Sequence, residues 1–429
     1  MAPISAYTME AVVKNDPRAI VLPFIFTPNP VVGMSSEVLY KKLLEGNDPA
    51  TGRPVIDEII DILTKPQEKK KPESKKESES IRPRETLQPD TEDNLQQIFY
   101  ERGWTDGLPI ILPTEERVHK MLTGTKRSPD ELVGEVYDHD HHELIKYTVG
   151  DLAVTAVMAG AKPEHFPVVL AIASLRQSSL RPSTTAFGSM LLVNGPIRNE
   201  LGMNAGIGAF SPVNQANSVI GRAWTIMSIC WGYAKPKRTL WSSQGCNDLY
   251  NNMCVPENEE RSVWIPFHVD KGYKPEESVV SLFRGWSVIN SIGCAAHRSI
   301  TEELNLEFGV MPPLHSRATI ILDPLVAANL KDNEGFHTKQ DYCRHLSENI
   351  KIPAGQYWKT DYIDMLISSQ ANAGVEPYAS WKLLPDDALI APFTNPENIN
   401  LIVVGGETSP LWKASEYGHS GSASIDEWR

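Results

Sequence analysis

The pattern of hydrophobic and polar positions predicts a mixture of helices and strands along this chain. Helical spacing of apolar residues, or the caps that begin and end a helix, predicts helices at 36–45, 54–63, 92–103, 115–123, 149–159, 163–177, 324–331 and 337–350. Short apolar runs rich in β-branched residues predict buried strands at 19–26, 108–112, 189–196, 277–287, 317–323 and 400–407. This mixture predicts an α/β or α+β fold with a mixed sheet and packed helices.

The pattern also divides the chain into three parts. Residues 1–64 predict a small strand–helix–helix element, which is too little to form an independent core and is expected to pack on a partner. Residues 65–91 are highly charged and contain no aromatic residue, as in a flexible linker. Residues 92–429 are then expected to form the main α/β domain.

The longest predicted helix, 211–233, follows a glycine-rich loop. Ser211 is expected to cap it and Pro212 to occupy its first position, with a buried apolar stripe running from Val213 to Cys230. A glycine-rich loop that leads into a helix N-terminus can hold an anion. The amides that could bind an anionic substrate there are Asn204, Asn214 and Asn217. Plain helix capping is the alternative, and the spacing does not match a dinucleotide-binding motif.

A long irregular stretch at 241–270 carries the groups best suited to chemistry. The thiols are Cys246 and Cys254, the carboxylates are Glu257, Glu259 and Glu260, and the imidazole is His268. Long loops inside compact domains are usually functional, and thiol, carboxylate and imidazole groups perform nucleophilic and acid–base catalysis. The candidate catalytic residues are therefore Cys246, Cys254, Glu257, Glu259 and His268. The alternative is a surface loop with solvated acids and buried thiols.

Two glycine-rich stretches and one histidine-rich stretch offer further candidates. The turn after the strand at 400–407 could present the backbone N–H groups of Gly405 and Gly406 to a substrate, and Gln244 lies in the central loop. The segment 418–424 (GHSGSAS) is expected to be a closing loop. The segment 137–143 (YDHDHHE) has metal-binding side chains, but one short run seldom supplies a complete ligand set, so no metal site is assigned.

Composition narrows the possible partners and location. The chain has 429 residues and a formal charge of −13, which argues against binding to nucleic acid or an anionic membrane. It has no apolar run of membrane-spanning length and no secretory signal pattern. Five cysteines are too few for a disulfide scaffold, which favours the cytoplasm. The sequence specifies no cofactor.

Two stretches resemble known families. The segments LPFIFTPNPVVGMSSE and ATGRPVIDEIIDILTKP, within 1–64, resemble the tail of the UGSC family of cysteine- or selenocysteine-containing proteins. That family carries a Cys (or selenocysteine)-Gly-Ser-Cys motif upstream of the tail, and this chain contains no CGSC. The remainder is similar to an uncharacterised bacterial family often found beside UGSC proteins, through DGLP, AVMAG, VNGP, CVPENE and PFHVDKGY. The resemblance implies a UGSC-type partner chain, or a second copy of this chain.

Together these features predict a cytoplasmic enzyme subunit that acts on a small, anionic organic substrate. Its chemistry would use thiol, carboxylate and imidazole groups, as in a lyase, a hydrolase or a thiol redox enzyme. The alternative is a non-catalytic subunit that completes a redox UGSC-like domain in an assembly.

Overall fold

The computed structural model describes residues 25, 36–48, 51–65, 86–138, 143–180, 187–232, 234, 242, 244–294 and 296–429. Nearly all of the predicted strand 19–26, most of the predicted linker 65–91 and the three histidines of the 137–143 segment lie outside the described residues. Within the described part of the chain, no helix combines the length and the apolar character needed to cross a bilayer.

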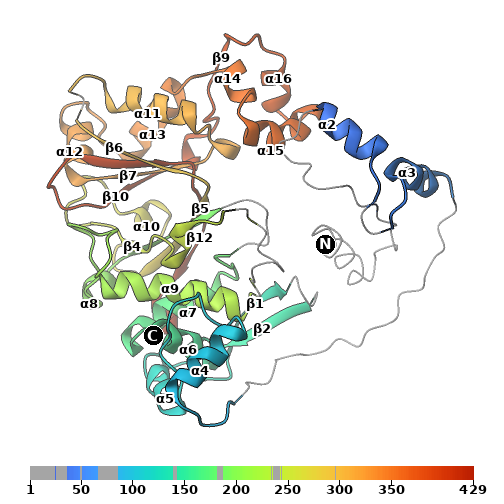
Figure 1. Ribbon diagram of the computed structural model, residues 1–429. Coiled ribbons are helices and arrows are strands. Elements are labelled where there is room, and N and C mark those ends of the chain that lie inside the picture. The colour runs from blue at the N-terminus through green and yellow to red at the C-terminus, as the bar shows by residue number, and fades with distance from the viewer. Residues whose placement is uncertain are drawn as a thin grey trace.

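Two four-stranded sheets stack face to face between two layers of helices (Figure 1). The first sheet has the order β12 (Gly418–Ser424), β5 (Val279–Gly285), β3 (Gly188–Asn194), β4 (Val255–Pro256). The second has the order β10 (Ile399–Val403), β7 (Ala318–Leu322), β11 (Leu411–Ser415), β6 (Val288–Ile292). Leu192 and Phe283 of the first sheet share one buried cluster with Ile321 and Ile402 of the second. The inner faces of the two sheets are therefore packed together.

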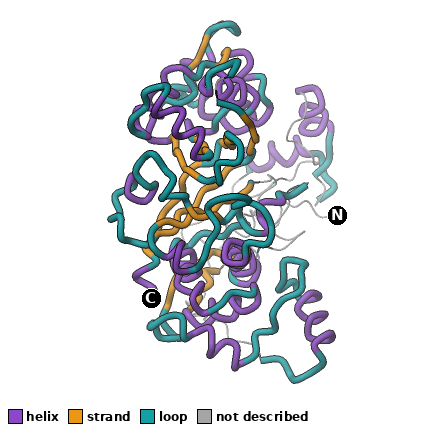
Figure 2. The backbone as a smooth tube through the Cα atoms, turned by 90° about the vertical axis from the view of Figure 1, so that its left-hand side faces the viewer, coloured by secondary structure: helices purple, strands orange, loops and turns teal. Residues whose placement is uncertain are grey.

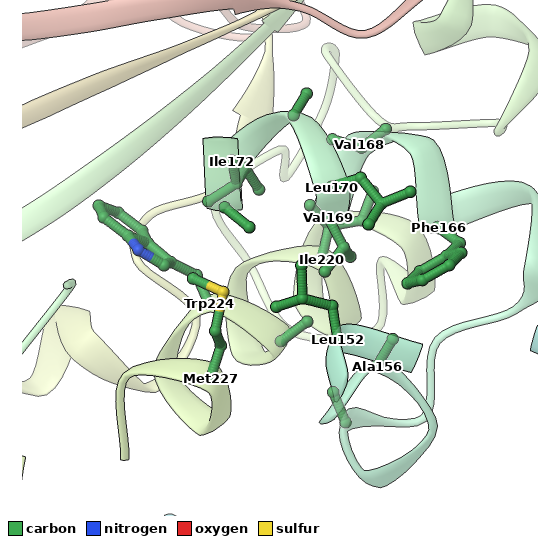
Figure 3. Packing of buried hydrophobic residues seen from close by; sticks show 14 of the residues in the cluster. Leu152, Ala156, Phe166, Val168, Val169, Leu170, Ile172, Ile220, Trp224 and Met227 are labelled. Atoms are coloured by element: carbon green, nitrogen blue, oxygen red, sulfur yellow. The ribbon is translucent and has the colours of Figure 1, made fainter. Parts of the chain in front are cut away.

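Helices cover the outer face of each sheet. The first sheet is covered by α6 (Val149–Ala159), α7 (Phe166–Ser174) and α9 (Gln215–Cys230). Figure 3 shows Ile220 and Trp224 of α9 beside Leu152 of α6 and Val169 of α7. The second sheet is covered by α11 (Ile300–Val310), α12 (Pro324–Asp332) and α13 (Lys339–Asn349). Strands β3, β7 and β10 are accordingly buried along their whole length.

The two sheets have the same strand order and directions. Read from β12 or from β6, neighbouring strands are antiparallel, antiparallel and then parallel. In each sheet a helical crossover joins the parallel pair, β3 to β4 and β7 to β10. The chain then leaves β5 to form the edge strand β6 of the second sheet, and later leaves β11 to form the edge strand β12 of the first. The halves 188–292 and 318–424 thus exchange their last strands.

The remaining elements surround this core, and Figure 2 shows the strands between helices. Before the sandwich come α4 (Glu92–Glu101), α5 (Glu115–Leu122) and a hairpin of β1 (Leu132–Asp138) and β2 (Glu143–Thr148). A further small cluster holds β8 (Ile352–Pro353), α14 (Ala354–Trp358), α15 (Asp361–Asn372), α16 (Tyr378–Lys382) and β9 (Leu389–Ile390). Short helix α8 (Ile197–Glu200) follows β3, and short helix α10 (Phe267–Asp270) ends the central loop. The N-terminal element contains α2 (Ser36–Tyr40), a π-helical turn at Lys41–Glu45 and α3 (Val55–Thr64).

The predicted α/β or α+β class is confirmed, and most predicted elements appear within a few residues of their expected bounds. Thr148 and Asp151 form a capping box at the start of α6. The predicted strand 108–112 is wrong, because these residues join no sheet. The side-chain amide of Gln96 instead bonds both the N–H and the carbonyl of Ile110, so a side chain replaces the hydrogen bonds of a neighbouring strand.

Two further predictions are corrected. The segment 418–424, expected to be a loop, is strand β12, because β5 supplies a backbone partner that its small side chains do not obstruct. The helix expected from Ser211 begins at Gln215. Asn214 donates to the carbonyls of Gly208 and Ser211 and so folds the preceding residues into a turn. Val213 lies outside the helix, 97% exposed and with φ of 77°.

Candidate functional site

A polar pocket of about 380 Å³ opens where β6 and β11 meet the segment that precedes β4. It is lined by Phe210, Asn247, Asp248, Asn251, Met253, Cys254, Val288, Asn290 and Lys413. The lining therefore combines residues of the central loop with residues of both exchanged halves. It has one cationic and one anionic side chain, three amides and one thiol.

The floor of the pocket is a tight turn pressed onto helix α9. A Cβ at Gly221 would lie 1.7 Å from the carbonyl oxygen of Asn251, so this approach requires glycine. Asn252 and Met253 are left-handed, with φ of 51° and 42°. The buried amide of Asn252 holds the turn by donating to the Gly221 carbonyl (2.7 Å) and to Thr225 Oγ1 (2.8 Å). Strained backbone of this kind often marks a functional site.

Lys413 projects between the two sheets. Its neighbours Trp412 and Ala414 are buried against the helices on the other face of β11, so strand alternation turns Lys413 inward. Its ammonium donates to Oδ1 of Asn290, its cross-strand partner on β6, and lies 5.3 Å from the centre of the Phe210 ring. Burial lowers the pKa of Lys413, and the Asp248 carboxylate partly offsets this effect.

The ring of Tyr417 fits between two glycines, and its hydroxyl holds Asp248 in place. Gly188 and Gly285 are cross-strand partners on β3 and β5, and the ring of Tyr417 lies against both. A Cβ at Gly188 would lie 2.0 Å from the Tyr417 hydroxyl oxygen. That hydroxyl donates to Asp248 Oδ2 at 3.2 Å. Burial and the nearby Asp248 carboxylate raise the pKa of Tyr417, so the hydroxyl keeps its proton and holds the carboxylate in place.

The thiols of the central loop are held in their protonated form. Cys254 is buried between the pocket and α9, and burial raises its pKa to about 12. Burial also raises the pKa of Cys246, and the charge of Asp248 adds to this effect. All five cysteines are free of disulfide bonds. Among the described residues, no cation lowers the pKa of either thiol, as happens in a catalytic thiol.

The predicted acid–base residues lie in a separate buried network at the end of β4. The fully buried Glu257 accepts from Asn194 Nδ2 (2.7 Å) and from the Phe267 N–H (2.6 Å), and pairs with Lys339 Nζ at 2.9 Å. Glu259 Oε1 accepts from Asn194 Nδ2 (2.9 Å) and the Gly195 N–H (2.8 Å). This network links the first sheet to α13 over the second.

Arg198 completes that network, and His268 lies beside it. The buried guanidinium of Arg198 bridges Glu259 (3.0 Å) and Glu260 (3.1 Å) and donates to the Glu257 carbonyl. The Arg198 hydrogen bond lowers the pKa of Glu260 to about 2. His268 is fully buried, its Nδ1 lies 3.9 Å from Glu259 Oε1, and neither ring nitrogen hydrogen-bonds to a described residue. None of these residues lines the pocket, whereas Cys254 does.

The predicted anion-binding amides fold their own loop. Asn217 Oδ1 accepts the Asn204 N–H, and Asn217 Nδ2 donates to the carbonyls of Asn204 and Ala209. Asn204 Nδ2 donates to the Ile207 carbonyl and to Asn214 Oδ1. These hydrogen bonds hold the loop together, and the Asn214 side chain at the N-cap of α9 accepts no hydrogen bond from the helix, so the expected side-chain capping is not observed.

The remaining predicted binding residues lie away from the pocket lining. Gly406 packs against Ile207, which lies 2.2 Å from a Cβ placed there, and the Gly405 N–H donates to the Ala205 carbonyl. The glycine turn therefore docks on the asparagine-rich loop. Gln244 is exposed and does not line the pocket.

Sequence reasoning missed Asp248, Asn290, Lys413 and Tyr417. Asp248 lies inside the predicted loop, but nothing in the sequence distinguishes it from other loop acids. The alternation in LWKAS (411–415) would place Lys413 opposite two buried residues once the strand is recognised. Neither the pairing with Asn290 nor the glycine slot for Tyr417 has a local signal.

No family model, curated protein or solved structure matches this chain. Among the described residues, no group of three or more His, Cys, Asp or Glu side chains is placed to hold a metal ion.

Proposed function

We propose that the pocket is the active site of an enzyme that acts on a small anionic organic molecule. The observation that carries this proposal is the placement of Lys413, whose inward-facing ammonium lies in the pocket wall beside Asp248. A volume of about 380 Å³ suits a small metabolite. A partly buried lysine in such a pocket provides a strong counter-charge for a carboxylate, because the local dielectric is lower than that of water.

The other polar groups supply orientation and proton transfer. The amides of Asn247 and Asn251 bring N–H donors to the wall that also holds Lys413. The Tyr417 hydroxyl engages one oxygen of Asp248 and fixes its orientation. We assign the role of general base to Asp248, because a positioned carboxylate next to a bound substrate contributes about 10²- to 10⁴-fold to proton-transfer steps. The protonated thiols make lyase or hydrolase chemistry by this acid–base route a better match than thiol redox chemistry.

Ligand-induced thermal stabilisation tests the proposal. Acetate, malonate, succinate and citrate would be titrated at constant ionic strength, with acetamide and succinamide as uncharged analogues. At a hundredfold excess over Kd, a bound ligand stabilises a protein by about 2.7 kcal/mol. We expect at least one carboxylate to raise Tm, and the corresponding amide to have no effect.

Matched variants locate the binding. K413M should abolish the shift, because it removes the counter-charge. K120M should retain it, because Lys120 is exposed on α5 in a different layer of the fold. The absence of any carboxylate-dependent shift, or an equal shift in K413M, would refute the assignment of the pocket.

We further propose that residues 1–64 dock on a UGSC-type partner chain. The resemblance of this segment to the tail of that family motivates the proposal, and the exposed side chains of α3 support it. Ile60 and Leu63 of α3 are 50% and 79% exposed. Apolar side chains grouped on one helix commonly mark a protein–protein contact.

A further inference from the structure

The edge strand β12 contains a bulge that brings a histidine and a serine onto one face. His419 is opposite Phe283 on β5, Gly421 is opposite Leu282, and Ser422 is opposite Ser281. Ser420 is therefore an extra residue in the ladder, and Gly421 has φ of 151°. Without the bulge, residues three apart on a strand would point to opposite faces. Bulges commonly redirect side chains next to active sites.

The two redirected side chains are within hydrogen-bonding distance. His419 Nε2 lies 2.8 Å from Ser422 Oγ, and Ser422 Oγ lies 2.7 Å from Ser281 Oγ. The Tyr273 hydroxyl donates to the Ser422 carbonyl at 3.1 Å and so anchors the strand at this residue. Ser281 is fully buried, whereas His419 and Ser422 are partly exposed. A serine and a base at this distance, with the serine open to solvent, form the basic unit of nucleophilic catalysis.

The imidazole of His419 is held in its neutral form, which can accept a proton from serine. The rings of Phe267 and Phe283 lie 5.4 Å and 5.3 Å from that of His419. Burial, with the charge of Lys271, lowers the pKa of His419 to about 4, so the ring is neutral at neutral pH. A hydrogen bond between the ring and the backbone of Gly421 opposes this shift and orients the imidazole. A neutral imidazole can accept the serine proton at Nε2.

The arrangement also corresponds in position to the Lys413–Asn290 pair. In the second sheet, Ile321 is paired with Lys413, which is paired with Asn290. In the first sheet, Leu192 is paired with Ser281, which is paired with Ser422. Leu192 and Ile321 both lie in the second-last pair of their parallel ladders, and on this alignment Ser281 and Ser422 are the counterparts of Lys413 and Asn290. Polar groups thus lie between the sheets at two corresponding places, and only the second-sheet pair lines the pocket described above.

We propose that Ser422 is the nucleophile of a second site, of esterase type, with His419 as its general base. The substrate class is a small carboxylic ester, because His419 and Ser422 are only partly exposed and the Phe267 and Phe283 rings beside His419 are buried. Lys271, whose Nζ is 3.6 Å from Asp270 Oδ2 and 5.1 Å from the centre of the Phe267 ring, is the nearby cation that can stabilise negative charge on the carbonyl oxygen.

The reaction balances without an added cofactor. Ser422 Oγ bonds to the ester carbonyl carbon as its proton passes to His419 Nε2, and Ser281 donates to the serine oxygen. The alcohol leaves with the proton from His419, and the acyl group remains on Ser422. Water then attacks the acyl carbon and gives a proton to His419, which returns it to Ser422 Oγ as the carboxylic acid departs.

Labelling of the full-length protein with diisopropyl fluorophosphate tests the proposal. We expect one phosphoryl adduct per chain, located by mass spectrometry on Ser422, and loss of p-nitrophenyl acetate hydrolysis with the same rate constant. S422A should lose the adduct. S420A should keep it, because Ser420 is the exposed neighbour on the same bulge and donates to the Leu282 carbonyl. K413M should also keep it, which separates this site from the proposed pocket.

H419Q distinguishes a base from a structural partner. Glutamine can keep a hydrogen bond to Ser422 but cannot take its proton, so labelling should slow at least about a hundredfold in a variant with an unchanged circular dichroism spectrum. In the wild-type protein the labelling rate should fall below about pH 4, where His419 becomes protonated. An adduct absent from Ser422, or a labelling rate in a folded H419Q equal to that of wild type, would overturn the proposal.

Discussion

Replacing Lys339 with methionine is expected to destabilise the protein by about 3–5 kcal/mol. The side chains of Lys339 and Glu257 are 3% and 0% exposed, and their charged atoms lie 2.9 Å apart. Methionine fills a similar volume but removes the counter-charge, so the Glu257 carboxylate stays buried with two neutral donors, Asn194 and the Phe267 N–H. The penalty is that of a buried and uncompensated charge.

The thermal shift follows from the size of the main domain. An unfolding entropy of about 2.1 cal/mol/K per residue, over the 338 residues of 92–429, gives about 0.7 kcal/mol per degree. K339M should therefore lower Tm by about 6 °C, measured by scanning calorimetry. K339M/E257Q should recover at least half of this loss, because glutamine carries no charge and can still accept the Phe267 N–H.

The exposed pair Lys359–Asp386 provides the control. Its atoms are closer, at 2.6 Å, but its side chains are 74% and 75% exposed. K359M should cost less than about 1 kcal/mol, because solvent screens the pair. The reasoning fails if K339M lowers Tm no more than K359M does, or if the double variant is less stable than K339M.

Three further predictions concern pH, thiol reactivity and assembly. The free energy of unfolding should fall by up to about 3 kcal/mol as the pH rises from 4.5 to about 7, because burial raises the folded-state pKa of Glu416 from 4.5 to about 7 and the folded state holds that proton more tightly. E416Q should flatten this dependence in urea titrations, and an unchanged slope would contradict the assignment. Iodoacetamide should modify Cys254 and Cys343 slowly in the folded protein, because burial raises the pKa of each thiol to about 12. Labelling of either at the rate seen in urea would be inconsistent with this burial. Deleting residues 1–64 should leave the main domain folded by circular dichroism but prevent association with a partner chain, and normal assembly in native mass spectrometry would count against the docking proposal.

The sequence revealed the parts of the fold whose signals are local. Strands β3, β7 and β10 are buried on both faces, so each reads as a continuous apolar run. Edge strand β6 and the alternating strand β11 lack such a run, so the sequence pattern did not predict them. Strand β12 contains mainly glycine and serine and depends on β5 for its conformation. The exchange of strands between the halves depends on pairing across more than a hundred residues, which no local pattern specifies.

The sequence predicted only part of the candidate site, because the rest also depends on tertiary contacts. The central loop was predicted to be functional from its length and chemistry, and it supplies Asp248 and Cys254 to the pocket. Lys413 enters from a strand about 160 residues further along the chain. The predicted carboxylates were chosen for their spacing, but spacing does not reveal that Lys339 and Arg198 neutralise them. Burial and charge pairing, set by tertiary packing, separate a structural acid from a catalytic one.

The strand exchange explains why both proposed sites depend on the complete sandwich. Two-residue links, Trp286–Ser287 and Glu416–Tyr417, carry the chain from one sheet to the other. They contact each other, because the buried Glu416 accepts the backbone N–H groups of Trp286 and Ser287. Through this crossing, β6 brings Asn290 to Lys413, and β12 brings Ser422 to Ser281. Each pair therefore joins one residue from each half, so neither half folded alone could assemble the pocket or the serine site.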